Sequence, residues 1–247
     1  MIAALEHFRP HQDELRKRLV RCCIAILLAS TVAYLCKDEL TAWLMRPLYL
    51  AYPQLGKLVY TKLTDAFLSY LKLAFMVGLA LTFPFLLHQV WLFVAPGLHD
   101  QEKRRVRTII LWGLLLFVAG AAFAFFVALP QMLHYFMSYA SPALQPMIKL
   151  GPYLTFTVRM VLAFAIAFEI PFLMVMATRA GLLKGGHFRQ KRIPFYCAIA
   201  VLSFLLASGE LTATVLLALP LLALYEAGIA ACRVFGGKRP TAPTTAP

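Results

Sequence analysis

Charged residues are scarce in this sequence. Asp, Glu, Lys and Arg make up only 14% of its 247 residues, whereas 61% are hydrophobic, and the mean hydropathy is +0.74. A typical soluble domain has about 25% charged and about 45–50% apolar residues. The composition therefore excludes an ordinary soluble domain and a disordered chain. The length allows several membrane spans of about 20 residues each, but no large soluble domain in addition.

Cysteine is sparse, and its spacing carries no known chemistry. The five cysteines form no C-x-x-C pair, and none is spaced with a histidine as in a zinc site. This excludes a disulfide scaffold and a structural zinc site. Most of the cysteines lie in or beside apolar runs, where they are expected to act as small buried hydrophobic residues.

Motifs of catalysis and cofactor binding are missing as well. The sequence has no G-x-x-x-x-G-K-[ST], G-x-G-x-x-G, H-E-x-x-H or G-x-S-x-G. His88 alone among the histidines lies well inside an apolar run, which is more typical of a hydrogen bond between helices than of a haem ligand. The sequence therefore predicts no catalytic centre, no cofactor and no metal, and the chain is not expected to be an enzyme.

Acidic residues are few, so the net charge is +13, from 24 Lys and Arg against 11 Asp and Glu. In a soluble protein such a surplus would suggest nucleic-acid binding. Here most of the basic residues lie in short stretches between apolar runs. That pattern is typical of charges that set membrane topology, and it also suits anionic lipid.

Long apolar runs are what the sequence does contain. Each is expected to be a helix, because lipid offers no partners for backbone N–H and C=O groups, and the lack of alternation excludes a β-barrel. The sequence thus predicts an all-α polytopic membrane protein with six transmembrane helices. The last two are expected to be short, since the fifth run covers about 22 Å of a hydrocarbon core of about 30 Å. The six runs are 19–36, 69–94, 108–129, 158–178, 194–208 and 211–229.

The distribution of Lys and Arg predicts the orientation. The segment before the first run has five, the 95–107 loop four, the 179–193 loop five and the tail three, against seven on the other side. Because basic loops stay in the cytoplasm, both termini are expected there. The 37–68 and 130–157 loops are then expected to face outward. Residues 1–235 are interpreted as one six-helix domain, and the Gly-, Pro- and Thr-rich residues 236–247 as a disordered cytoplasmic tail.

Glu169 and Pro171 stand out inside the fourth run. A carboxylate at the centre of a membrane helix costs about 2.5–3.5 kcal/mol on insertion scales. Pro171 leaves the carbonyl of Ala167 without its helical partner, so a kink is expected that could open a polar pocket. The functional interpretation is a hydrated cavity or a polar contact for a translocated chain. The alternative is a Glu held by a neighbouring helix for packing.

Acidic residues within the basic cytoplasmic segments are the second unusual feature. Glu102 follows the turn after the second run and precedes Lys103 and two arginines. By charge alone it could neutralise these neighbours or pair with an incoming guanidinium. Glu14 lies in an amphipathic stretch before the first run, whose bases suit the membrane surface but do not need an acid.

At these residues the sequence resembles the TatC family, the multispanning subunit of the twin-arginine protein translocase. The matching pieces run in family order across nearly the whole chain, and together they are specific. They are H-Q-D-E-L-R-K-R-L (11–19), R-P-L (46–48), D-A-F (65–67), K-L-A-F (72–75), P-F-L-L-H-Q-V-W-L-F-V-A-P-G-L (84–98), E-K-R-R (102–105), F-E-I-P-F (168–172), K-R-I-P (191–194), L-A-L-P (217–220) and Y-E-A-G (225–228).

The resemblance implies a function and a location. Members of the family recognise signal peptides with two consecutive arginines and pass folded proteins across the bacterial inner membrane, driven by the proton gradient. Small single-span partners, TatA and TatB, complete the complex, in which the chain is expected to form homo-oligomers.

The resemblance also implies roles for particular residues. Glu14, Phe93 and Glu102 match the family's signal-peptide patch, in which two carboxylates would distinguish an arginine pair from a single base. Glu169 matches the family's intramembrane glutamate, and Pro47 a proline of the first outer loop. Between the last two runs Glu210 keeps the acid of the family's turn but not its prolines, and Thr214 replaces a common glutamine. This region is implied in docking a partner helix.

Two other classes of protein compete with this interpretation. A small-solute or ion transporter would use Glu169 as a proton relay, but such proteins usually show inverted repeats, and the two halves of this chain differ in loop length and proline placement. An intramembrane enzyme would need a nucleophile with a base, or metal ligands, at membrane depth, and none is visible.

Overall fold

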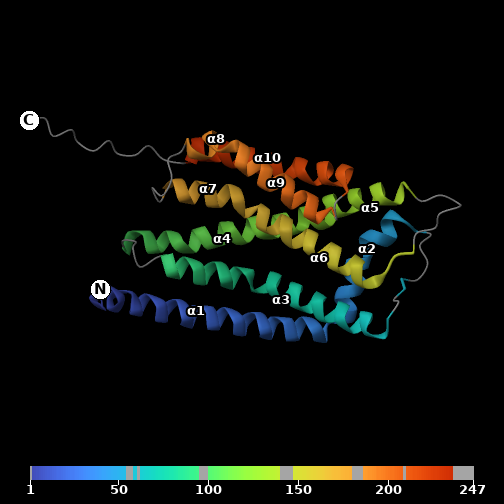
Figure 1. Cartoon of the computed structure of the whole chain (residues 1–247), viewed down its shortest axis with the longest axis horizontal. Helices are drawn as coiled ribbons and strands as arrows, with labels where there is room; N and C mark the ends of the chain where they lie inside the picture. The colour runs from blue at the N-terminus through green and yellow to red at the C-terminus, as the bar shows by residue number, and fades with distance from the viewer. Residues whose placement is uncertain are drawn as a thin grey trace, which may run out of the picture. The chain divides into compact units, whose positions relative to one another are not determined.

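The computed structural model describes residues 2–53, 58–59, 62–94, 100–139, 147–179, 186–207 and 210–235, and within them the chain is helical (Figure 1). The prediction of an all-α protein is confirmed. An isolated bridge between Val59 and Lys149 is the sole β-type pairing in the described part. The helices are α1 (Ile2–Leu35), α2 (Lys37–Ala51), α3 (Leu63–Val94), α4 (Asp100–Phe123), the π-helix η2 (Ala124–Ala128), α5 (Leu129–Met137), α6 (Leu150–Ala167), α7 (Glu169–Arg179), α8 (His187–Gln190), α9 (Arg192–Leu206) and α10 (Leu211–Phe235).

Five helical segments are long and apolar enough to cross a membrane. They are Glu14–Leu35, Thr64–Gln89, Leu111–Met137, Leu150–Thr178 and Leu211–Val234. The remaining predicted span corresponds to α9, an apolar helix of only 15 residues. The prediction that this helix is short is confirmed, whereas the count of six spans stays a prediction.

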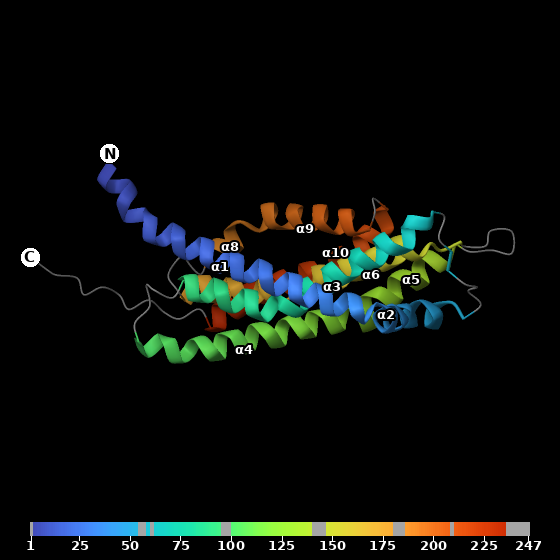
Figure 2. The same ribbon diagram turned by 90° about the horizontal axis from the view of Figure 1, so that it is seen from below.

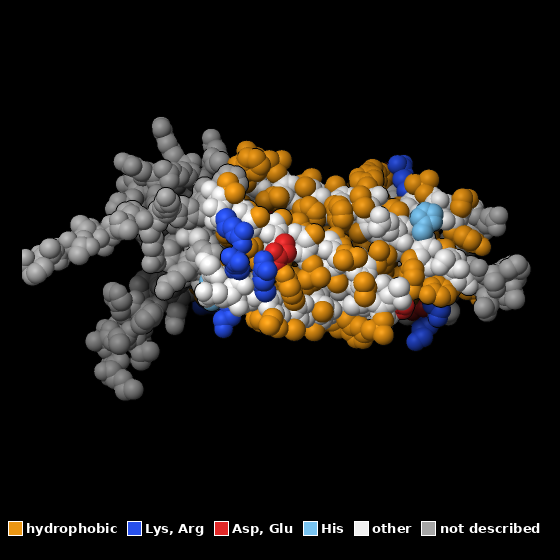
Figure 3. Space-filling view, turned by 90° about the horizontal axis from the view of Figure 1, so that it is seen from above, with side chains coloured by type: hydrophobic (Ala, Val, Ile, Leu, Met, Phe, Trp, Pro, Cys, Tyr) orange, Lys and Arg blue, Asp and Glu red, His pale blue; other side chains and the backbone are white. Residues whose placement is uncertain are grey.

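The chain divides into two compact units, residues 1–165 (unit 1) and 166–247 (unit 2). The expectation of a single domain over 1–235 stays a prediction, and the predicted tail 236–247 lies outside the described residues. Hydrophobic side chains cover much of the face shown in Figure 3, and basic side chains gather near its ends. Such a surface is what helices in contact with lipid require.

An antiparallel pair of helices, α1 and α3, forms the frame of unit 1. The two helices lie side by side in both ribbon views, and α1 begins at the end where α3 stops (Figures 1 and 2). They approach so closely at Gly78 that a Cβ atom there would lie 2.6 Å from the backbone nitrogen of Ser30. Small residues permit such close contact between membrane helices. Helix α4 joins this frame through the stacked rings of Phe83 and Phe117, whose centroids are 4.0 Å apart.

The third predicted span was expected to end before Pro130, and this boundary is wrong. The helix continues through η2 into α5 and ends at Met137. Pro130 lies in the first turn of α5, and the π-helix before it changes the hydrogen-bond pattern at the point where a proline removes a donor. The loop expected over 130–157 is correspondingly shorter, because it is helical up to Met137 and again from Leu150.

Unit 2 is held together by contacts of α10 with α7 and α9. Gly228 of α10 lies against α7, where an added Cβ would be 3.1 Å from the Cα of Pro171 and 2.7 Å from the sulfur of Met174. The hydroxyl of Tyr225 donates a hydrogen bond of 2.8 Å to the carbonyl of Phe188 in α8. These contacts place the kinked fourth run, the connecting turn and the last helix in one compact body.

The prediction that the last helix is short is wrong, since α10 has 25 residues and extends to Phe235. The apolar run was taken to end at Gly228, because glycine usually weakens a helix. Here that glycine is buried against Pro171, and the packing keeps it within the helix. The alanines that follow it favour continuation.

Candidate functional site

Three sequence segments with predicted site residues meet at one end of unit 1. The beginning of α1, the end of α3 and the beginning of α4 lie together there (Figure 1). The contact between Ser30 and Gly78 fixes the register of the antiparallel pair. Glu14 precedes Ser30 by as many residues as Val94 follows Gly78, so Glu14 and Phe93 lie within about one helical turn of the same level.

Glu14 is the member of this group whose side chain is described. It accepts a hydrogen bond from the guanidinium of Arg18, one turn further along α1. The Glu14 side chain is nevertheless 42% exposed, whereas that of Arg18 is 15% exposed. A partly exposed carboxylate paired with a local arginine can exchange that partner for another guanidinium, because exposed ion pairs contribute little on their own.

Phe93 and Glu102 are placed by their helices only. Phe93 is the last residue but one of α3, and Glu102 is the third residue of α4. Their side chains, and the whole of residues 95–99, lie outside the described residues. An acid in the first turn is also favoured by the helix dipole, which gives Glu102 a structural reason to be there in addition to the predicted one.

Glu169 lies at a break in the fourth predicted span. Helix α6 ends at Ala167, Phe168 forms a turn, and α7 begins at Glu169. The kink predicted from Pro171 is therefore present at the residue whose carbonyl that proline leaves unpaired. The Glu169 side chain is 2% exposed, and neither carboxylate oxygen has a hydrogen-bond partner within the part of the chain that the structure describes. A buried polar group without a partner is costly, and such groups mark functional sites in membrane proteins.

Pro47 is buried inside α2 rather than exposed in a loop. The first predicted outer loop thus contains a helix. That helix packs on α6, since the hydroxyl of Tyr153 donates a 2.7 Å hydrogen bond to the carbonyl of Leu44. The ring of Trp43 stacks on Phe125 at 5.6 Å, and the guanidinium of Arg46 lies 5.3 Å from the Trp43 ring. Pro47 therefore acts within a packed outer cap.

Glu210 and Thr214 are both engaged at the beginning of α10. The carboxylate of Glu210 accepts a 2.6 Å hydrogen bond from the backbone N–H of Ala213, and its carbonyl accepts one of 2.6 Å from the hydroxyl of Thr214. Glu210 thus caps the helix, a role that sequence analysis missed because Ser, Thr, Asp and Asn are the usual capping residues.

A hydrogen-bonded cluster between α9 and α10 was also missed. The guanidinium of Arg192 donates to Glu226 over 2.8 Å, and the hydroxyl of Tyr196 donates to the other oxygen of the same carboxylate. The motifs K-R-I-P and Y-E-A-G contain Arg192 and Glu226, but their pairing needs the fold. Among the described residues no group of three or more His, Cys, Asp or Glu side chains could hold a metal ion.

Known proteins resemble this chain over nearly its whole length. The family model described as Sec-independent protein translocase protein (TatC) matches residues 10–220. The TatC protein of Desulforapulum autotrophicum is 33% identical over 232 residues, which are 94% of this chain and 86% of the relative. That of Escherichia coli K12 is 32% identical over 228 residues, 92% of this chain and 88% of the relative.

Solved structures show the same fold. A crystal structure of the twin-arginine translocase receptor TatC superposes with a TM-score of 0.84 at 30% identity, covering 91% of this chain and 98% of the other. A second crystal structure of that receptor, in the detergent DDM, gives 0.82 at 31% identity over 89% of this chain and 98% of the other. This chain therefore belongs to the TatC family, whose members are membrane proteins of the twin-arginine protein translocase.

Proposed function

We propose that this chain recognises twin-arginine signal peptides and, with TatA- and TatB-type single-span subunits, transports folded proteins across the bacterial inner membrane by using the proton gradient. The observation that carries the proposal is the family match over residues 10–220, which includes Glu14, Phe93 and Glu102. The chain acts as a receptor and translocase core, without catalysing a reaction and without a cofactor. Several copies work together in the complex.

The signal-peptide site lies at the end of unit 1 where α1 begins, α3 ends and α4 begins. The register of α1 and α3, which brings Glu14 level with Phe93, supports this position. In the proposed site Glu14 and Glu102 accept hydrogen bonds from the two guanidinium groups, and Phe93 offers its ring face to one of them. Lysine cannot form the same two-pronged bonds, so a Lys-Lys peptide binds more weakly. The basic residues nearby repel cations that are placed wrongly.

Photo-crosslinking tests the receptor role and the site together. A photoreactive residue replaces Phe93 in the full-length protein in membranes, which are offered an Arg-Arg or a Lys-Lys signal peptide. A strong crosslink with Arg-Arg and a weak one with Lys-Lys is expected. If a correctly inserted protein gives no crosslink, the site is wrong, and solute transport through the Glu169 region becomes the working hypothesis.

Substitution of Glu102 provides an independent test. Glu102→Gln removes the charge but keeps the size, and loss of a charge-assisted hydrogen bond of about 1.5–3 kcal/mol lowers signal-peptide binding by at least about tenfold. Asp100→Asn is the matched control, because it removes an acid two residues earlier in the same helix turn. Near-normal export of twin-arginine substrates by the inserted Glu102→Gln protein would contradict the proposal.

The topology that goes with this function has six spans and both termini in the cytoplasm. The charge distribution supports it, and α9 is the fifth span despite its 15 residues. A helix of that length requires local thinning of the bilayer or shielding by a partner. The turn before α10, with Glu210 and Thr214, is the proposed docking place for a partner helix, and Pro47 shapes the outer cap.

Glu169 and Pro171 form the proposed polar contact inside the membrane. The break at Phe168 and the two unpaired carboxylate oxygens support this role, because a partner or a translocated chain could supply the missing donors. The close packing of Pro171 on Gly228 holds the break in place.

A further inference from the structure

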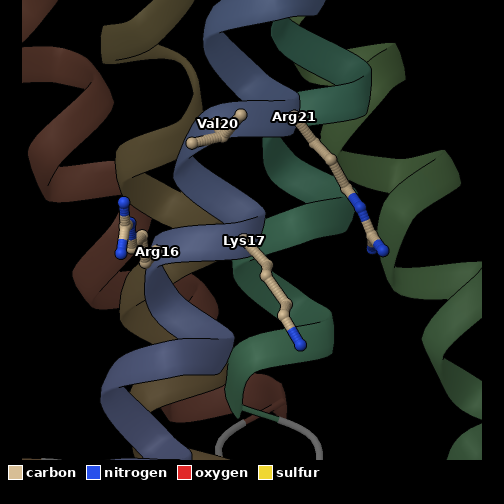
Figure 4. A pocket seen from close by; sticks show the side chains of 4 residues that line it. All are labelled: Arg16, Lys17, Val20 and Arg21. Atoms are coloured by element: carbon tan, nitrogen blue, oxygen red, sulfur yellow. The ribbon is translucent and has the colours of Figure 1, made fainter.

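A basic groove runs along the first helix and is not used by the proposed signal-peptide site. It has a volume of about 380 Å³, and its described lining consists of Arg16, Lys17, Val20 and Arg21. Figure 4 shows Arg16 on one side of α1 and Lys17 and Arg21 on the other, with their cationic ends extended away from the helix axis. All three basic residues are exposed. The groove therefore presents three cationic groups around a small apolar floor.

The same face of α1 continues as an apolar stripe. Val20, Ile24, Leu27 and Leu28 follow one another at helical spacing and are 49%, 51%, 64% and 65% exposed. In the apolar part of this helix only 6% of the residues are buried inside the protein. The groove thus opens directly onto a surface that contacts hydrocarbon in a membrane.

We propose that this groove binds an anionic phospholipid of the bilayer, with the phosphate between Arg16, Lys17 and Arg21 and an acyl chain along the apolar stripe. The charges require an anion, which a hydrophobic partner helix would not supply. The adjoining stripe requires an apolar chain, which free phosphate lacks. A phospholipid satisfies both, and its binding position is independent of any signal peptide.

Native mass spectrometry of the full-length protein, released from micelles with equal amounts of phosphatidylglycerol and phosphatidylcholine, tests the proposal. The wild-type protein is expected to retain phosphatidylglycerol preferentially. Each basic residue near an anionic surface contributes about fivefold to binding, so the combined variant Arg16→Gln, Lys17→Gln, Arg21→Gln should lower this retention by up to about 100-fold.

A matched control removes the same number of charges elsewhere. Arg189, Lys191 and Arg233 are also exposed, and their combined replacement by Gln should leave phosphatidylglycerol retention unchanged. Equal retention by the groove variant and the wild-type protein would overturn the proposal, as would displacement of the lipid by inorganic phosphate. If the groove variant does not fold, the wild-type protein decides: retention that does not fall with rising ionic strength contradicts an electrostatic headgroup site.

Discussion

At the scale of single residues, Glu169 differs from the other buried polar groups in carrying two carboxylate oxygens that both lack a partner within the described part of the chain. Its burial is almost complete, at 2% exposure. If the carboxylate served packing alone, it would be expected to have a donor from a neighbouring helix. Its position next to a helix break, without such a donor, favours a role in function over a role in stability.

Replacing Glu169 by leucine should separate these two roles. Because the change removes an unpaired buried polar group and keeps much of the volume, the free energy of unfolding should rise or stay constant within about 1 kcal/mol. Export of folded substrates should fall strongly. Thermal unfolding in detergent and an export assay measure the two effects.

Ser203→Ala is the control for this experiment. The Ser203 hydroxyl is also fully buried and has no partner in the described residues, but it lies away from the helix break. This variant should export normally. A Glu169→Leu protein that unfolds much more easily than the wild type would show that the carboxylate stabilises the fold after all.

At the scale of helices, the tightest contacts involve glycines. Gly78 faces the backbone of Ser30, whereas Gly151 of α6 faces only the hydroxyl of Ser69, which an added Cβ would approach to 2.4 Å. A side-chain hydroxyl can rotate away, but a backbone cannot move without separating the helices.

These contacts predict opposite outcomes for two similar substitutions. Gly78→Ala should lower the free energy of unfolding by about 1–3 kcal/mol, because it forces α1 away from α3. Gly151→Ala should change it by less than about 1 kcal/mol. Thermal unfolding of both variants in the same detergent compares them directly, and equal destabilisation would show that the α1–α3 pair is not the rigid frame of unit 1.

Sequence reasoning predicted helix type well and helix ends less well. The break before Glu169 follows from Pro171 alone, because a missing N–H acts locally. The continuation of helix through Pro130 and past Gly228 depends on a π-turn and on packing against Pro171, neither of which is visible in a linear pattern. Similarly, the pairing of Arg192 with Glu226 joins residues from two helices and requires the fold.

The candidate site was predicted in the same uneven way. Glu14 and Glu102 are conspicuous as acids in basic segments, but their charge alone leaves a purely local ion pair as an equal explanation. The family resemblance added Phe93, and the register of α1 and α3 adds that Glu14 and Phe93 lie at one level. Glu210 shows the opposite case, since its capping hydrogen bond gives a local reason for an acid that was interpreted as a docking residue.

At the scale of the whole molecule, the open question is how many times the chain crosses the membrane. Five segments meet the length required, and α9 does not. With five spans the two termini would lie on opposite sides, whereas with six they lie on the same side.

Reporter fusions should place both termini in the cytoplasm. A fluorescent protein attached after Phe235 should be bright, and alkaline phosphatase inserted after Tyr139 or after Ala207 should be active, because these positions are expected outside. An inactive phosphatase after Ala207, together with an active one after Tyr139, would mean that α9 does not cross and that the proposed topology is wrong.

The π-turn between α4 and α5 has a consequence for how this coding sequence can change. Its wide turn accommodates one residue more than an ordinary helix would, and everything after it is rotated by about 100° per residue. The buried face of α5 consists of Leu129, Met132 and Leu133. Loss of a single codon within η2 would bring Pro130, Leu133 and His134 into those positions. A deletion that keeps the reading frame would thus put a polar ring in the core, so the length of this helix is under constraint as strictly as its composition.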